Sequence, residues 1–151
     1  MPTCIFCKII KGEIPSVAIW EDAQHLAILD VNPNTRGMTL VLTKAHYDSY
    51  AFAMPDDAYA RFMAAAKTVA GVLERGLGVA RVAMVAEGMG VNHAHLKLYP
   101  LHGVDAEFKE MWAEGRVWFD RYEGYVSTKM GPAVELEKLR KVGEEVKRKQ
   151  G

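Results

Sequence analysis

Two imidazoles and an ammonium recur at every second residue in the segment 92–100, Asn-His-Ala-His-Leu-Lys-Leu-Tyr-Pro. Side chains alternate between the two faces of a β-strand, so His93, His95, Lys97 and Tyr99 would share one face and the small apolar residues between them the other. Such a face suits an anionic substrate, a metal ion or both. Paired histidines on a strand are also found as solvated residues of a half-exposed sheet, and the rest of the chain has to decide between these readings.

Two features elsewhere in the chain favour a ligand- or metal-binding role for these histidines over a solvated sheet face. Gly88 and Gly90 lie just upstream, where a backbone without side chains can approach a ligand closely. The only two cysteines form the pair Cys4-Ile-Phe-Cys7. A thioredoxin-like pair normally follows a buried strand, which is not predicted here, and a disulfide is disfavoured in a reducing compartment. Two thiolates can supply half of a tetrahedral zinc site, and the chain has five histidines from which to complete it.

The composition predicts a single domain, because 151 residues of which half are apolar can bury one core. Basic and acidic residues balance at 19 each, which argues against a nucleic-acid binder with a basic surface but leaves nucleotide-sized ligands open. No apolar run approaches the roughly 20 residues that span a bilayer, so no membrane partner is expected. No basic-then-apolar leader is visible at the N-terminus, and we expect a cytoplasmic protein.

The elements that must position these residues are predicted from periodicity. A helix is expected from Pro55 onward, with an apolar stripe from Tyr59 to Leu73, ended by Gly76 and Gly78. Alternating or apolar runs predict five strands, over residues 17–21, 25–31, 38–43, 79–86 and 93–99. Strands in hairpins around one long helix indicate an α+β domain with a mainly antiparallel sheet.

The C-terminal third has a different character. An aromatic-rich stretch over residues 108–122 is expected to be core or interface. Leu136, Leu139, Val142 and Val146 then predict a final amphipathic helix whose polar side carries both signs of charge.

Four motifs, in this order along the chain, resemble those of the histidine triad (HIT) family. They are the opening 4–15, the strand 27–31 ending Asp-Val, the segment 37–42 with Lys-Ala-His at 44–46, and His-Ala-His-Leu-Lys-Leu at 93–98. The match covers roughly residues 3–101. It implies a HIT-like α+β fold with a five-stranded, mainly antiparallel sheet and one long helix, in a single domain 1–151 with its core at 3–101 and a C-terminal helical extension at 102–151.

The resemblance implies an activity. Family members are mostly homodimers that bind a purine nucleotide, and their middle histidine attacks the α-phosphorus to give a nucleotidyl-imidazole that water hydrolyses. Here that residue is His95, and a neutral imidazole is nucleophilic at neutral pH. Asp30 matches the residue that binds the ribose hydroxyls, although a strand-end aspartate also begins turns. Ile28 and Leu29 are candidates for the apolar base pocket.

The remaining ligands follow in the same way. The opening motif resembles the zinc-containing bacterial and archaeal-type branch, and the matching positions for a structural zinc ion are Cys4, Cys7, His46 and His93. Such a site is closed and leaves no open position for catalysis. The loop before the triad, where the family holds phosphate, offers Gly88, Gly90 and Asn92.

Three positions depart from the family pattern. The third triad histidine is Lys97, Met38 replaces a further histidine, and Met89 and Gly90 replace a glutamine and a hydroxyl. A lysine carries positive charge toward phosphate but is a poor proton donor at neutral pH. Positioned general-acid catalysis is worth about 10²–10⁴ in rate, so we expect a preference for leaving groups that need little protonation, such as those of dinucleoside polyphosphates.

Three readings stay open at this point. The chain is a hydrolase or transferase that uses His95 and Lys97, a nucleotide-binding protein with little or no catalysis, or a metal-stabilised interaction module whose aromatic third binds a partner. His102 is read as a turn residue or as a substitute acid, with the turn favoured, and His25 has no assigned role.

Overall fold

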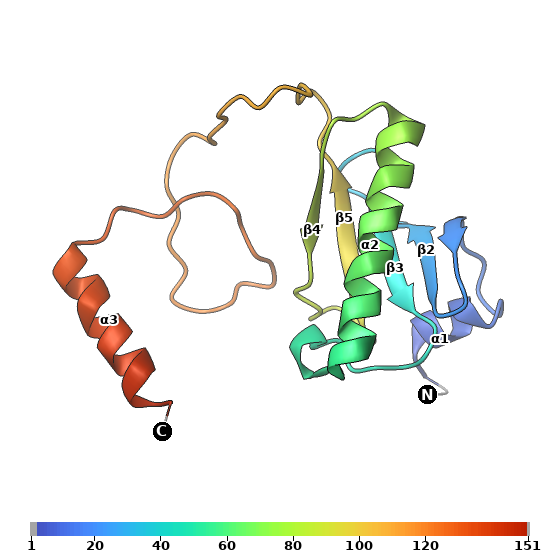
Figure 1. Ribbon diagram of the computed structural model, residues 1–151, viewed down its shortest axis with the longest axis horizontal. Coiled ribbons are helices and arrows are strands. Elements are labelled where there is room, and N and C mark those ends of the chain that lie inside the picture. Colours follow the sequence, from blue (N-terminus) through green and yellow to red (C-terminus); the bar gives the residue numbers. More distant parts are fainter. Residues whose placement is uncertain (1–2, 151) are drawn as a thin grey trace. The chain divides into compact units, whose positions relative to one another are not determined.

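The computed structural model describes residues 3–150, which form two units that divide between Lys109 and Glu110. The first unit contains, in order, α1 (Ile5–Ile10), β1 (Ala18–Glu21), β2 (His25–Leu29), β3 (Thr39–Thr43), a 3₁₀ turn (Ala51–Ala53), α2 (Asp56–Leu77), β4 (Val82–Val85) and β5 (His95–Pro100) (Figure 1). The second contains α3 (Leu136–Arg148). The assignment of the whole chain to one domain stays a prediction.

The five strands form one antiparallel sheet in the order β1-β2-β3-β5-β4. This confirms the predicted α+β class, with its five-stranded sheet and one long helix. In the register of β3 and β5, Leu42 lies opposite His95 and Leu40 opposite Lys97. β5 therefore sits inside the sheet, hydrogen-bonded on both sides, which makes it a rigid support for the side chains that it carries.

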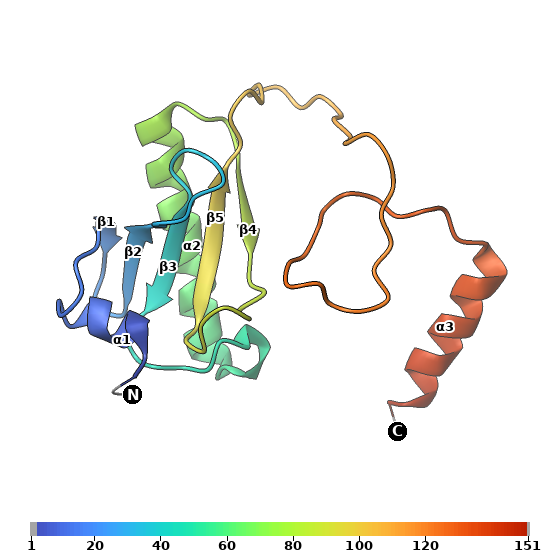
Figure 2. The same cartoon turned by 180° about the vertical axis from the view of Figure 1, so that it is seen from behind.

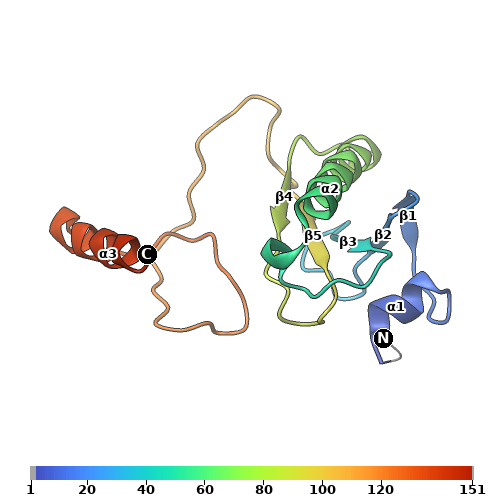
Figure 3. The same cartoon turned by 60° about the horizontal axis from the view of Figure 1, so that its bottom comes forward.

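The two faces of the sheet are covered by different helices, α2 on one and α1 on the other (Figures 2 and 3). Phe62 and Val69 of α2 pack on Val41 and Leu96 in the larger core. On the other face, a smaller apolar cluster joins α1 to the sheet; its buried members are Phe6, Leu26, Ile28, Leu40 and Leu42. The side chains of β5 thus divide between two distinct environments.

Several predicted boundaries need correction. The strand predicted over 25–31 ends at Leu29, because the Asp30 carboxylate accepts a hydrogen bond from the Asn32 N–H (2.7 Å) and the chain turns there. The strands predicted over 79–86 and 93–99 are Val82–Val85 and His95–Pro100. α2 continues through Gly76 and ends only at Leu77, where Gly78 at φ 66° supplies the left-handed cap that favours glycine.

α1 is an element that the sequence reading missed. It spans six residues and has no side-chain cap at its N-terminus, so the local signals that announce a helix are absent. Its buried residues are Phe6 and Cys7, which face the sheet.

In the second unit, residues 110–135 form neither helix nor strand, and α3 follows them. The aromatic-rich stretch is expected from the sequence to be core or interface, and its two tryptophans are not core: Trp112 and Trp118 are 62 % and 68 % exposed. α3 buries none of its residues, and Leu139 and Val142 on its predicted apolar stripe are exposed. Among residues 3–150, no helix is both long and apolar enough to cross a membrane.

Candidate functional site

β5 presents the predicted alternation. Ala94, Leu96 and Leu98 belong to the core under α2. His95 and Lys97 therefore point to the opposite face, toward α1, where their cross-strand neighbours Leu42 and Leu40 lie in the smaller apolar cluster. His93 precedes the strand and is completely buried. The prediction that the small apolar residues take one face of this segment, and that His95 and Lys97 take the other, is confirmed.

Four side chains that can ligate a metal converge beside the start of β5. Their ligand atoms all lie within 4.8 Å of one another, and we call Cys4, Cys7, His46 and His93 the metal cluster. Cys4 Sγ lies 3.4 Å from His93 Nδ1, and Cys7 Sγ lies 3.3 Å from His46 Nδ1 and 3.5 Å from His93 Nδ1. The structure therefore brings together the four residues of the predicted zinc site, which come from α1 and the residue before it, the loop after β3 and the segment before β5.

Three sulfur–nitrogen distances in the metal cluster fit a tetrahedral zinc ion. Bonds of about 2.3 Å to sulfur and 2.0–2.1 Å to nitrogen place sulfur and nitrogen about 3.5 Å apart on a tetrahedron, which is the separation observed. Burial raises the pKa of the metal-free Cys7 thiol, and the neighbouring Cys4 raises it further. A cation at the centre would favour both thiolates, so the donor set is suited to bound metal more than to free thiols.

The orientation of His93 is fixed from behind. Its Nε2–H donates to the main-chain oxygen of Thr43 at 2.7 Å, which leaves Nδ1 without a proton and aimed at the two sulfurs.

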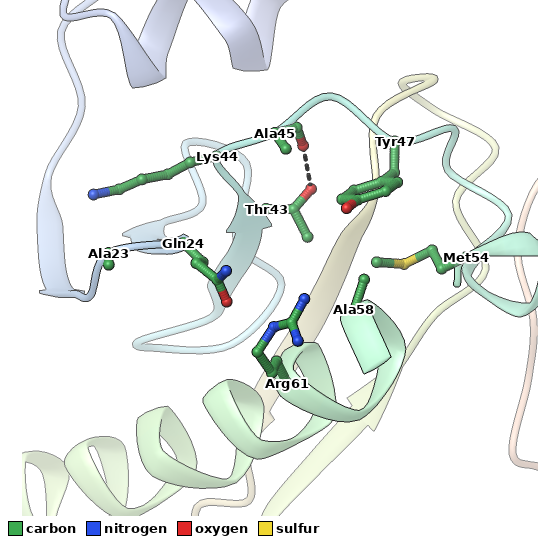
Figure 4. A pocket seen from close by; sticks show the side chains of 9 residues that line it. All are labelled: Ala23, Gln24, Thr43, Lys44, Ala45, Tyr47, Met54, Ala58 and Arg61. Atoms are coloured by element: carbon green, nitrogen blue, oxygen red, sulfur yellow. Dashed lines mark hydrogen bonds between the residues drawn. The ribbon is translucent and has the colours of Figure 1, made fainter. Parts of the chain in front are cut away.

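Thr43 ends β3 and also lines a cavity of about 150 Å³ on the α2 side (Figure 4). In that cavity Gln24 and Arg61 face Tyr47, and Thr43 Oγ1 donates to the Ala45 oxygen.

His95 has the geometry of a nucleophile. Its Nδ1–H donates to the main-chain oxygen of His93 at 2.7 Å, so Nε2 carries the free lone pair. Among residues 3–150 no hydrogen-bond partner of Nε2 is found, and no unpaired side-chain nitrogen is fully buried, so this atom keeps some contact with solvent. His95 as a residue is only 5 % exposed.

The surroundings of His95 favour the neutral ring. Burial lowers its pKa below the ordinary 6.5, and the positive charge of Lys97 lowers it further, against the opposing effects of the His93 carbonyl, Glu87 and Asp30. Burial also raises the pKa of Tyr99, and the charges of Asp30 and Glu87 raise it further. The charges of Lys97, Glu87 and Asp30 therefore act on the face of β5 that carries His95.

The candidate binding residues separate into two groups. Ile28 shares the sheet face and the apolar cluster of His95, and Asp30 follows at the end of the same strand. Leu29 is on the opposite face, where it lines a cavity of about 300 Å³ beside Val72 and Leu77 of α2. Alternation thus excludes Leu29 from any pocket that Ile28 and His95 share.

In the loop before β5, Asn92 and Gly88 make structural contacts with the segment around Ser49. The Asn92 side chain accepts from the Ser49 N–H (2.9 Å) and donates to Asp48 (3.2 Å), so it joins this loop to the segment after β3. Gly88 is buried at φ 71°, and a Cβ there would lie 2.7 Å from the Ser49 oxygen. Gly90 is exposed with open space beside it, and is the glycine where a ligand could approach without displacing protein.

Three further residues complete the account. His102 is exposed in a turn and its Nε2–H donates to the Arg36 oxygen at 2.8 Å, which agrees with the turn reading. His25 is buried on the α2 face, stacked on Phe62 and bonded to Asp22. The sequence reading overlooked Phe6, which lies between the two cysteines and contacts the rings of both His93 and His95. Its place inside the Cys-x-x-Cys pair was the available signal.

The fold is an α+β domain with a five-stranded antiparallel sheet, and His93 and His95 lie just before and at the start of its inner strand β5. Comparisons with known proteins identify the family. The model of the HIT domain family matches residues 11–103, so the chain belongs to the HIT domain family. An uncharacterized HIT-like protein of Methanocaldococcus jannaschii is 40 % identical over 108 residues, which are 69 % of this chain and 83 % of that protein.

Solved structures are similar over most of the chain. A protein of Streptococcus mutans superposes with a TM-score of 0.71 at 27 % identity, covering 100 % of this chain and 87 % of that one. A zinc-bound histidine triad family protein of Mycobacterium smegmatis gives 0.62 at 31 % identity, covering 73 % and 84 %. Over a shorter stretch of 44 residues (29 % of this chain, 33 % of the relative), the chain is 52 % identical to the adenosine 5′-monophosphoramidase of Schizosaccharomyces pombe.

Proposed function

We propose that this protein is a hydrolase or transferase that acts on the α-phosphate of a purine nucleotide derivative through a covalent intermediate on His95. The observation that carries the proposal is the state of that imidazole. Its Nδ1–H is engaged by the His93 carbonyl, Nε2 is free, and burial beside Lys97 keeps the ring neutral. A neutral, oriented imidazole is what an attack on phosphorus requires.

The step needs no resident metal. The Nε2 lone pair forms a bond to the α-phosphorus while the bond to the leaving group breaks and its electron pair departs with that group. Water then attacks phosphorus and releases His95 and the nucleoside monophosphate. Lys97, two residues along the same face, would lie where its charge can stabilise phosphate oxygens.

The leaving group is the finer part of the proposal. A phosphoramidate loses an amine, which needs a proton as the bond to phosphorus breaks. A dinucleoside polyphosphate that is attacked at its α-phosphorus loses the remaining nucleoside oligophosphate, whose terminal phosphate leaves as an anion that needs little protonation. Lys97 is a poor proton donor compared with an imidazole, and this favours dinucleoside polyphosphates or similar compounds as substrates.

The supporting residues take distinct roles. Asp30 is proposed to bind the ribose hydroxyls, with Ile28 against the base and the loop around Gly90 near the phosphate. The metal cluster is proposed to hold a structural zinc ion; when bound, zinc cross-links α1 to the β5 segment and leaves no open coordination position.

The assembly and location belong to the same proposal. We infer a homodimer in the cytoplasm. β4 is an edge strand of the sheet with Met84 half exposed, so its open edge offers a surface for a second copy. Two free cysteines, one of them buried, are compatible with a reducing compartment.

Trapping the intermediate tests the proposal. The protein is mixed with diadenosine polyphosphate, quenched under alkaline denaturing conditions and analysed by peptide mass spectrometry for an added nucleoside monophosphate on His95. His95→Ala should show no adduct and no turnover. His102→Ala, an exposed histidine in a turn, should retain both. Turnover undiminished in His95→Ala would refute the proposed nucleophile.

Lys97 also supports a second candidate, a nucleotide-binding protein with little turnover. In that case nucleotide would bind measurably to the wild type, for example by calorimetry, while neither an adduct nor product appears. Binding without chemistry would favour this candidate over the first.

A further inference from the structure

The His95 ring is held by two contacts, and one of them comes from α1. The hydrogen bond to the His93 oxygen fixes one edge of the imidazole. Against the ring lies the phenyl group of Phe6, with centroids 5.1 Å apart and planes at 67°, an edge-to-face contact. Phe6 is itself 7 % exposed and packs in the smaller apolar cluster, so it cannot readily move away from His95.

What holds Phe6 in place is the attachment of α1. A helix of six residues without a side-chain cap is far below the roughly 12–15 residues at which isolated helices become even marginally stable in water. It is attached through the Phe6 side chain, with Ile9 and Ile10 packed on the same apolar cluster, and through the two sulfurs of the metal cluster, which flank Phe6 in sequence. A metal ion bound by both thiolates would clamp the backbone on either side of this ring.

The second contact leads back to the same cluster. His93 supplies the metal cluster with Nδ1 and supplies His95 with its main-chain oxygen. Phe6 also lies edge-on to the His93 ring, with centroids 5.8 Å apart. Both restraints on His95 therefore pass through residues that a bound metal would fix.

We propose that Phe6 is a positioning residue for His95, and that occupancy of the metal cluster sets the orientation of that imidazole by fixing α1. This rests on the proposed function and adds a regulation to it. Metal controls the nucleophile without touching the substrate, and the coupling residue is a phenylalanine.

Kinetics separate this role from a simple contact with substrate. An aromatic pair of this geometry corresponds to a factor of up to about ten, so Phe6→Leu should lower kcat about tenfold and leave KM within about twofold. Phe6→Tyr keeps the ring and should restore kcat. Ile5→Ala is the matched control, since Ile5 lies on α1 next to Phe6, is 46 % exposed and is not a member of the apolar cluster that attaches the helix; its kcat should stay near that of the wild type.

A second readout does not depend on turnover. Imidazole ¹⁵N shifts of His95 are recorded at about pH 8, where an ordinary imidazole is neutral. Zinc-loaded wild type should show a single Nδ1–H tautomer, as should Phe6→Tyr and Ile5→Ala. Zinc-loaded Phe6→Leu, and the wild type after chelation, should show exchange-averaged shifts.

Two results would overturn the inference. One is an unchanged His95 signature in Phe6→Leu and in chelated protein, and the other is a rise in KM at constant kcat, which would make Phe6 a substrate contact only. If the wild type proves to have no turnover, the proposed function fails, while the ¹⁵N spectra still decide whether Phe6 and metal orient His95.

Discussion

Lys97→His should restore proton donation to the leaving group. Lys97 is half-buried on β5, paired with Leu40 of β3 and Val85 of β4, so an imidazole at this position would occupy the same face as His95. An ammonium gives up its proton poorly near neutral pH, whereas an imidazole does so readily. The strand fixes the position in both proteins and the change concerns the donor alone.

The expected gain depends on the leaving group. General-acid catalysis by a positioned side chain is worth about 10²–10⁴ in rate, or roughly 3–5 kcal/mol of transition-state stabilisation. Hydrolysis of an adenosine phosphoramidate, whose amine must be protonated, should gain about 10² or more in kcat/KM. For diadenosine polyphosphate, whose leaving adenosine oligophosphate needs little protonation, kcat/KM should change less than about tenfold.

The assay compares kcat/KM for both substrates in wild type and Lys97→His by chromatographic detection of the nucleoside monophosphate. His95→Ala in the Lys97→His background should abolish both activities, which ties the gain to the same nucleophile. Lys97→Gln serves as a matched control without a donor and should show no gain on either substrate. Equal gains on the two substrates, or a loss on both, would refute the argument from proton donation.

Other predictions concern pH, the loop and the metal. Because protonation of His95 removes the nucleophile, kcat/KM should fall on the acid side with a midpoint below pH 6.5; Lys97→Gln should move this midpoint up, since the cation that disfavours imidazolium is gone, and a downward movement would contradict it. Gly88→Ala should lower the free energy of unfolding by about 1–3 kcal/mol in denaturant titrations, because its Cβ meets the Ser49 oxygen and φ is positive, whereas Gly90→Ala should change it by less than about 0.5 kcal/mol. Chelation should lower the melting temperature of zinc-loaded protein, with zinc reversing it, and an unchanged melting temperature would exclude a structural role.

Much of the fold could be predicted because its signals are local. The apolar stripe over the helix that begins after Pro55 and the alternation of residues 94–98 both follow directly from helix and strand periods. α1 could not be predicted from such signals. It is too short to show a period and lacks a cap, and tertiary attachments rather than propensity place it on the sheet.

The candidate site shows the same division. That the two cysteines need further ligands follows from donor chemistry, whereas the choice of His46 and His93 among the five histidines comes from the resemblance to the HIT family. The separation of Ile28 from Leu29 was available from alternation, which sends neighbouring strand residues to opposite faces. The contacts of Asn92 and Gly88 with the segment around Ser49 join distant parts of the chain, so no local sequence pattern predicts them.

The exposed tryptophans of the second unit make intrinsic fluorescence sensitive to association at this part of the chain. Of its three tryptophans, Trp112 and Trp118 lie in that unit in contact with water, while Trp20 is half-buried in β1. Intrinsic fluorescence should therefore be dominated by long-wavelength emission from residues 110–151. Any molecule that covers this stretch would shift the emission to shorter wavelength, so association through the C-terminal third can be followed on the unlabelled protein.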